Sequence, residues 1–208
     1  MSSAAAPAPL KRHALALPAG SVRAIHVLAI VGVFCAMILM PSAPTIPPYL
    51  IYLLFLMVGH YFAAHGVTIA TRDEAAPSPL YLPGGTVRGL VVVALVGCIG
   101  WRLYSDEAGL IRQFEASLEL LKMEPILPLV ILGGFFLGVM VRAVLLRLEP
   151  RPGFQDFEAW VSLIALLGIV IAGIIHLIVS PSLADSLYLP TWESFVGGVV
   201  AFYFGERS

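Results

Sequence analysis

Charged residues and cysteines are both scarce in this chain. Charged side chains make up 12% of its 208 residues, whereas hydrophobic ones make up 59%. Soluble domains carry about 25% charged residues, so this composition excludes an ordinary soluble domain and indicates a chain that folds in lipid. The only two cysteines, Cys35 and Cys98, lie in separate apolar runs. They exclude a disulfide framework and a zinc motif, and we expect both thiols to pack as small hydrophobic groups.

Complete catalytic, nucleotide-binding and metal-binding motifs are also missing. The Pro-Gly-Gly at 83–85, for example, is not followed by the Gly-Lys-Ser/Thr of a phosphate-binding loop. The net charge of −1 offers no basic excess to a nucleic acid. We therefore predict a protein that is not an enzyme, requires no cofactor and binds no nucleic acid.

Long apolar runs are what the sequence has in abundance. A helix of about 20 residues crosses the hydrocarbon core of a bilayer, which is about 30 Å thick. Prolines separate six apolar runs, of which the last is shorter and carries Glu193 at its start; the runs are 22–40, 49–65, 87–104, 126–146, 159–179 and 192–205. We predict an all-α integral membrane protein with six transmembrane helices.

The entries to two of these helices repeat each other. Segment 17–25, LPAGSVRAI, aligns without a gap with segment 82–90, LPGGTVRGL, and we call them the entry segments. In each, Ser21 or Thr86 is expected to cap the helix, and Arg23 or Arg88 to lie at the lipid headgroups. With a looser third copy at 151–153, the pattern predicts three repeated helical hairpins, at 17–66, 82–146 and 153–208.

Basic residues indicate how these helices are oriented. If the N-terminus is inside, nine of the 12 lysines and arginines lie on or near the cytoplasmic face, as the positive-inside rule requires. Both termini are therefore predicted to be cytoplasmic, in a bacterial inner membrane, with 1–16 as a disordered tail. Four arginines near span ends are predicted interfacial anchors: Arg23, Arg88, Arg142 and Arg207.

The longest connection contains an amphipathic pattern at 106–122, predicted to be an interfacial helix on the outer surface. Its apolar residues recur at helical spacing and are Leu110, Ile111, Phe114, Leu118 and Leu121. This face either packs onto the bundle or docks a partner protein, because helix-in-groove recognition uses the same spacing.

Histidines are the best candidates for chemistry inside the spans. His26 and His60 are predicted to reach similar depth on the cytoplasmic side, where they could meet and bind a cofactor such as haem. No His-x-x-His spacing accompanies them. The alternative is that each forms hydrogen bonds between helices or lies at the interface.

Three functions remain open at this point. The first is a non-catalytic multi-pass subunit that scaffolds or anchors a larger complex, with membrane lipids and other membrane protein subunits as partners. The second is a small oligomeric channel or transporter built from parallel hairpin repeats. The third is a redox subunit with a histidine-ligated cofactor on His26 and His60.

Overall fold

The computed structural model of the chain is all-helical in the residues it describes, which are 17, 20–40, 45–63, 79–83, 85–123, 125–145, 152–178 and 190–206. The predicted all-α class is confirmed. The elements are α1 (Ser21–Leu39), α2 (Pro48–Ala63), a short 3₁₀ helix η3 (Pro79–Tyr81), α3 (Thr86–Met123), α4 (Ile126–Leu145), α5 (Pro152–Ile178) and α7 (Pro190–Glu206). The predicted tail, 1–16, and Arg207 lie outside the described residues.

Within the described residues, three stretches are long and apolar enough to cross a membrane: Ser21–Leu39, Thr86–Lys122 and Ile126–Val144. The first has 19 residues, which at a rise of about 1.5 Å per residue nearly matches the hydrocarbon core. Shorter apolar stretches occupy Pro48–Phe62 and Ala159–Ile175.

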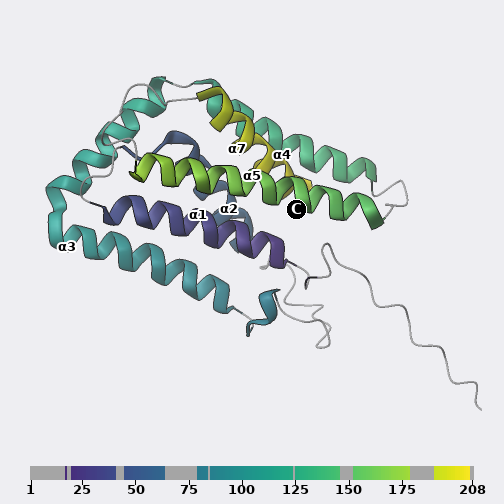
Figure 1. Cartoon of the computed structure of the whole chain (residues 1–208), viewed down its shortest axis with the longest axis horizontal. Coiled ribbons are helices and arrows are strands. Elements are labelled where there is room, and N and C mark those ends of the chain that lie inside the picture. Colours follow the sequence, from purple (N-terminus) through teal and green to yellow (C-terminus); the bar gives the residue numbers. More distant parts are fainter. Residues whose placement is uncertain are drawn as a thin grey trace, which may run out of the picture.

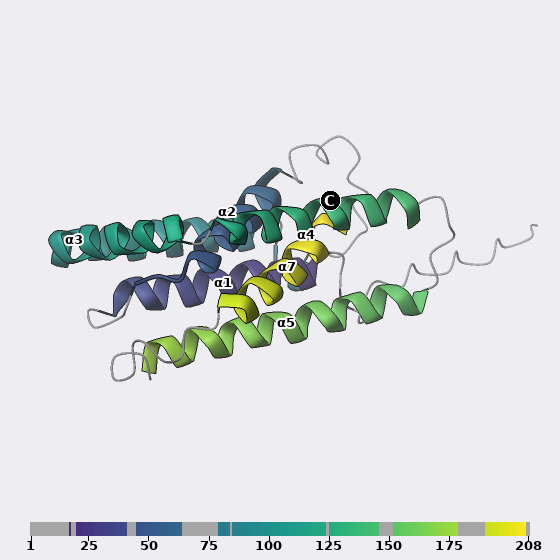
Figure 2. The same cartoon turned by 90° about the horizontal axis from the view of Figure 1, so that it is seen from above.

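Helix α1 occupies the centre of the bundle. It packs against α3 on one side and α5 on the other, and also against α2. Figures 1 and 2 show α4 and α7 crossing at the side of the bundle next to α5 and α2. Accordingly, 56% of the α1 stretch is buried, against 17% for those of α3 and α4.

Helices α3 and α4 follow each other in the chain but do not pack side by side. Helix α3 packs on α1 and α2, whereas α4 packs on α7 and α2. The second predicted hairpin, 82–146, is therefore not a packing unit of the bundle, and the hairpin repeat stays a prediction about chain topology.

The helices alternate in direction along the chain. In Figure 1, α1, the first half of α3 and α5 run from right to left, and α2, α4 and α7 return. The start of α1 and the end of α7 consequently lie at the same end of the bundle, which we call the entry end. The opposite end, where α3 bends, is called the bend end.

The two entry segments share a backbone geometry. Gly20 and Gly85 have φ values of 83° and 92°, a left-handed conformation that glycine adopts without strain. The carbonyl of each accepts the hydrogen bond of the residue four positions on, at 2.9 Å. The predicted side-chain cap of α1 is wrong: Gly20, not Ser21, is its N-cap, with no side-chain hydrogen bond.

The hydroxyls of the entry segments bind elsewhere. The Ser21 Oγ accepts a hydrogen bond from the Leu80 N–H at 2.9 Å, which ties η3 to the start of α1. The Thr86 Oγ1 donates to the Pro83 carbonyl, also at 2.9 Å. Both hydroxyls are thus used by the chain before α3 rather than by the first turn of a helix.

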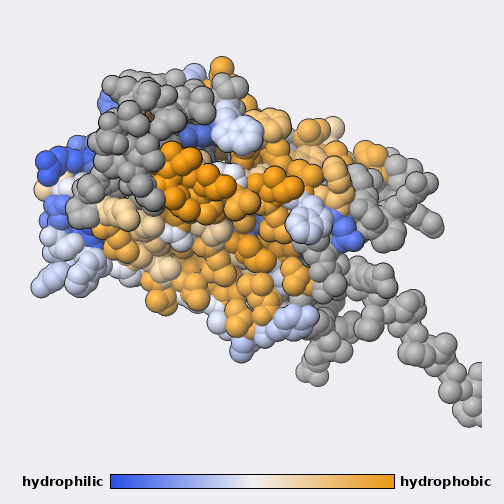
Figure 3. All heavy atoms as spheres, in the orientation of Figure 1, coloured by the Kyte–Doolittle hydropathy of each residue, from blue (hydrophilic) through white to orange (hydrophobic). Residues whose placement is uncertain are grey.

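Apolar side chains fill the middle of the bundle, and the buried polar ones lie near its ends. The core includes buried residues such as Ile30, Leu53, Ile131 and Ile169. Figure 3 shows hydrophobic residues across the centre of one face and hydrophilic ones gathered where α3 bends. The described part of the bundle thus has an apolar middle with polar groups at both ends.

Candidate functional site

His26 is fully buried at the entry end, and both of its ring nitrogens face backbone carbonyls. Its Nδ1 lies 2.8 Å from the Val22 oxygen, in the preceding turn of α1. Its Nε2 lies 3.1 Å from the Ser162 oxygen, in α5. A neutral imidazole has one N–H, so it donates to one carbonyl at a time. Ligation of a metal would require His26 to give up one of these two contacts.

The two candidate histidines both contact Phe204, near the end of α7. The Phe204 ring centre lies 5.9 Å from that of His26 and 5.7 Å from that of His60. His26 also stacks on Tyr203 at 5.5 Å, and His60 meets Phe135 edge-on at 5.9 Å. Both rings are thus brought to the same aromatic side chain, and the proposed cofactor role of His26 and His60 stays a prediction.

Three of the predicted anchoring arginines lie near His60 or near the next residue of α2, Tyr61. The charges of Arg23 and Arg142 act on His60, and those of Arg88 and Arg23 act on Tyr61. These arginines come from α1, α4 and α3, and the two residues they surround follow each other on α2. We call Arg23, Arg88, Arg142, His60 and Tyr61 the arginine cluster.

Aromatic rings hold Arg88 in place within this cluster. Its guanidinium carbon lies 5.9 Å from the centre of the Tyr61 ring and 5.7 Å from that of Phe62. Both distances are in the range of cation–π attraction. On α4, the Arg142 Nη1 donates to the Glu206 carbonyl oxygen at 3.4 Å, which connects the cluster to the end of α7.

Comparisons with protein-family models, curated proteins and solved structures found no match. Among the described residues, no group of three or more histidine, cysteine, aspartate or glutamate side chains is arranged to hold a metal ion. Three arginine cations lie among the described polar groups at the entry end, beside one buried carboxylate, that of Glu206. Their chemistry favours the binding of an anion.

The second candidate site is the outer half of α3, which begins at a bend. Asp106 has non-helical backbone angles (φ −161°, ψ 74°), and its Oδ1 accepts a hydrogen bond from the Gly109 N–H at 2.9 Å. This is the geometry of a helix N-cap. The Asp106 carboxylate also pairs with the buried Arg102 at 3.0 Å.

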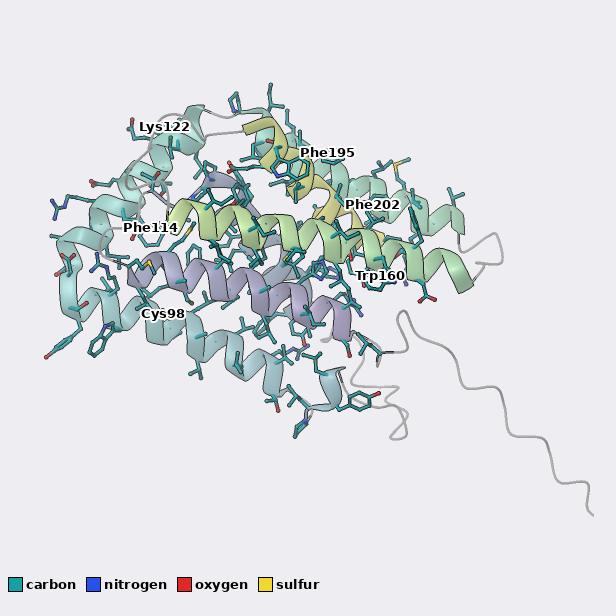
Figure 4. The ribbon with its side chains drawn as sticks, viewed as in Figure 1. Cys98, Phe114, Lys122, Trp160, Phe195 and Phe202 are labelled. Carbon is teal, nitrogen blue, oxygen red and sulfur yellow. The ribbon has the colours of Figure 1, made fainter. Side chains whose placement is uncertain are left out.

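One face of this outer half packs on the bundle. The Gln113 Nε2 donates to the Met37 carbonyl at 3.1 Å, and the Ser117 Oγ accepts from the Ile46 N–H at 2.9 Å. The outer half therefore contacts both the last turn of α1 and Ile46, two residues before α2. Figure 4 labels Phe114 and Lys122 on this segment.

The predicted apolar face of the segment is divided between packing and exposure. Leu110 is buried at 3% exposure, and Phe114 and Leu121 are half-buried. Ile111 and Leu118 remain 47% and 55% exposed. Leu110, Phe114 and Leu121 therefore fit packing onto the bundle, whereas Ile111 and Leu118 remain exposed to a partner. Partner docking stays a prediction for this exposed pair.

Several residues of these sites were not found by sequence reasoning. The His26 ring contacts the backbone carbonyl of Ser162. A backbone contact of this kind is not revealed by any pattern of side chains. Glu206 is buried although it lies next to the last residues of the chain. The two thiols also lie near each other, and the Cys35 Sγ donates to the Ala94 carbonyl, one turn before Cys98, at 3.7 Å. The proximity of the two cysteines could have been predicted, because both lie at similar depth in spans that run in the same direction.

Proposed function

We propose that this chain is a six-span protein of a bacterial inner membrane that anchors or scaffolds other membrane protein subunits and performs no chemistry itself. Three long apolar helices, two shorter apolar stretches and the alternating helix directions support the membrane assignment. The positions of the lysines and arginines support cytoplasmic termini. The common geometry of Gly20 and Gly85 supports a repeat with two matching helix entries.

The distribution of buried polar side chains carries the functional part of this proposal. In the described residues they are Ser21, His26, Arg102, Ser117, Ser162, Glu193 and Glu206. His26 and Ser162 meet each other near the entry end, Glu206 ends α7 there, and Arg102 and Ser117 lie near the bend end. A transport path needs polar groups at membrane depth, and the apolar middle of the bundle favours anchoring instead.

The outer half of α3 is the segment that we assign to partner binding. It is fixed to its own bundle by Gln113 and Ser117, which keeps Ile111 and Leu118 exposed on a supported helix. A helix held in this way presents its side chains without an ordering cost when a partner binds. We expect the partner to be a membrane protein subunit that contacts this helix outside the lipid.

The test is purification of the tagged protein in mild detergent, with its molar mass, the stoichiometry of co-purifying proteins and its absorption spectrum recorded. We expect a stoichiometric partner that is lost when Ile111 and Leu118 are both replaced by Asp. The matched control is Arg112→Gln, on the exposed side of the same helix, which should retain the partner.

Other outcomes would overturn the proposal in distinct ways. A partner-free homo-oligomer that conducts ions in liposomes would establish a channel formed between subunits. A haem absorption band that disappears in His26→Ala or His60→Ala would establish the redox function. Loss of the partner in Arg112→Gln as well would remove the assignment of the docking surface.

A further inference from the structure

The arginine cluster contains hydrogen-bond donors that its protein neighbours do not use. Arg88 is half-buried, and its Nη2 is a buried atom with no hydrogen-bond partner among the described residues. The same holds for the His60 Nε2. A guanidinium offers five N–H donors and no acceptor, and leaving a buried donor without a partner costs free energy. An oxygen-rich anion would satisfy this requirement.

Backbone dipoles add to the positive potential at the same place. Arg23 and Arg88 each lie in the first turn of a helix, because α1 begins at Ser21 and α3 at Thr86. The N-terminus of a helix carries about half a positive charge and attracts anions. The N-termini of α1 and α3 therefore lie at the entry end. The three arginines of the cluster, which come from three different helices, lie there as well.

A route for acyl chains starts next to Arg88. Along α3, the apolar side chains that follow Arg88 on its own side of the helix remain exposed at Val92 and Val96. Residues three or four apart share a face of a helix, so Val92 and Val96 continue from Arg88 as an exposed apolar strip. A free inorganic anion would make no use of this strip, whereas a lipid would lie along it.

We propose that the arginine cluster binds the phosphate group of an anionic phospholipid, with Arg88 as its central ligand and the acyl chains along the exposed strip of α3. Arginine pairs with phosphate through two parallel hydrogen bonds, and the rings of Tyr61 and Phe62 orient the Arg88 guanidinium before the lipid arrives. This inference rests on the proposed membrane insertion. If the arginines were only interfacial anchors, each would act separately. A lipid site requires them to act together on one phosphate group.

The test is thermal unfolding of the full chain in neutral detergent, followed by intrinsic fluorescence. The probes are micelles doped with phosphatidylglycerol, micelles doped with phosphatidylcholine, and inorganic phosphate alone. We expect phosphatidylglycerol to raise the melting temperature more than the other two. In Arg88→Gln, the phosphatidylglycerol concentration that gives half of the shift should rise roughly tenfold, as expected for the loss of a hydrogen bond to a charged group.

Matched variants separate a site from general surface charge. Arg112→Gln removes one exposed arginine from the outer half of the same helix and should leave the lipid effect unchanged. Arg88→Lys keeps the charge but loses the planar fork, so it should fall between the wild type and Arg88→Gln. If Arg88→Gln does not fold, Arg142→Gln is measured in its place, with the same expectation of a weaker lipid effect.

The contrary outcomes are equally specific. Equal shifts with phosphatidylcholine, a full shift with inorganic phosphate alone, or equal losses in Arg88→Gln and Arg112→Gln would each overturn the lipid site. An alkaline carbonate wash of membranes tests the insertion separately. If the chain is washed off, the proposed function fails; if it is retained but ignores phosphatidylglycerol, only the lipid site fails.

Discussion

Glycine residues set the distance between α4 and α7. A Cβ atom at Gly134 would overlap the backbone of Gly198, and one at Gly138 would overlap backbone atoms of Phe202 and Glu206. One at Gly205 would overlap the backbone of Phe135 in the other direction. Backbone atoms cannot move aside as a side chain can, so these positions tolerate no added carbon. Close approach through small residues is a common way for helices to associate in lipid.

This contact predicts that Gly138→Ala lowers the stability of the protein. Overpacking costs about 1–3 kcal/mol, which exceeds the roughly 1 kcal/mol by which alanine favours a helix over glycine. The melting temperature in detergent measures the effect. Gly133→Ala is the matched control, because a Cβ there meets no atom within 4 Å, and it should be neutral or slightly stabilising. Equal effects of the two substitutions would contradict the packing of α4 on α7.

At the scale of elements, α3 is two helices joined by one residue. Its first half runs beside α1, and its second half contacts Met37 at the end of α1 and Ile46 just before α2. The turn is made by Asp106, which leaves the helical conformation and caps the next segment through Gly109. Arg102 is buried, and within the described part of the chain its ion pair is with Asp106.

Asp106→Ala is therefore expected to destabilise the outer half of α3. Loss of an N-cap costs about 0.5–2 kcal/mol, and a buried Arg102 without its carboxylate adds to that cost. Hydrogen exchange of the amides in 107–123 should become faster, with a smaller change in the rest of the bundle. Glu107→Ala alters the neighbouring, exposed carboxylate and should leave the exchange unchanged. Uniform acceleration throughout the chain would argue against a local cap.

The contact between α1 and α3 can be tested with the native cysteines. Figure 4 marks Cys98 on α3 where this helix runs beside α1, and its thiol partner is Cys35. Mild oxidation should join the two thiols by a disulfide within one chain. After cleavage at a protease site inserted between α2 and α3, the fragments should remain linked until a reductant is added. Cys35→Ser should abolish the link, and a wild-type chain that separates without reductant would refute this packing.

At the scale of the whole molecule, two independent observations bear on topology. The alternating helix directions bring the start of α1 and the end of α7 to the same end of the bundle. The contact of Arg142 with Glu206, and that of His26 with Phe204, agree with this arrangement. Which side of the membrane that end occupies depends on charge, because basic residues are retained in the cytoplasm.

Reporter fusions at each terminus test both statements together. We expect a fluorescent reporter that folds in the cytoplasm to be active at either terminus, and alkaline phosphatase, which requires the periplasm, to be inactive at both. Termini on opposite sides would contradict the helix arrangement. Termini that are both outside would contradict only the orientation derived from the lysines and arginines.

Local features of the chain could be predicted without the fold, because each depends on a few neighbouring residues. The all-helical class follows from the apolar runs, and the break before 106–122 follows from the change to an amphipathic pattern at Asp106. The capping prediction was wrong at Ser21 for a local reason as well. Gly20 adopts a left-handed conformation, so the chain enters α1 without a side-chain cap.

The sequence by itself determined that apolar helices are present, where arginines mark their ends, and how the outer half of α3 starts. Only the tertiary structure decided that α1 is central, that both histidines contact Phe204, and that arginines from three helices lie near His60 and Tyr61. The physical reason is the solvent. In water, the buried face of a helix is its apolar face, but in lipid both the buried and the exposed faces are apolar. Periodicity therefore does not reveal which face of a helix meets another helix, and only packing determines the rotation of each one.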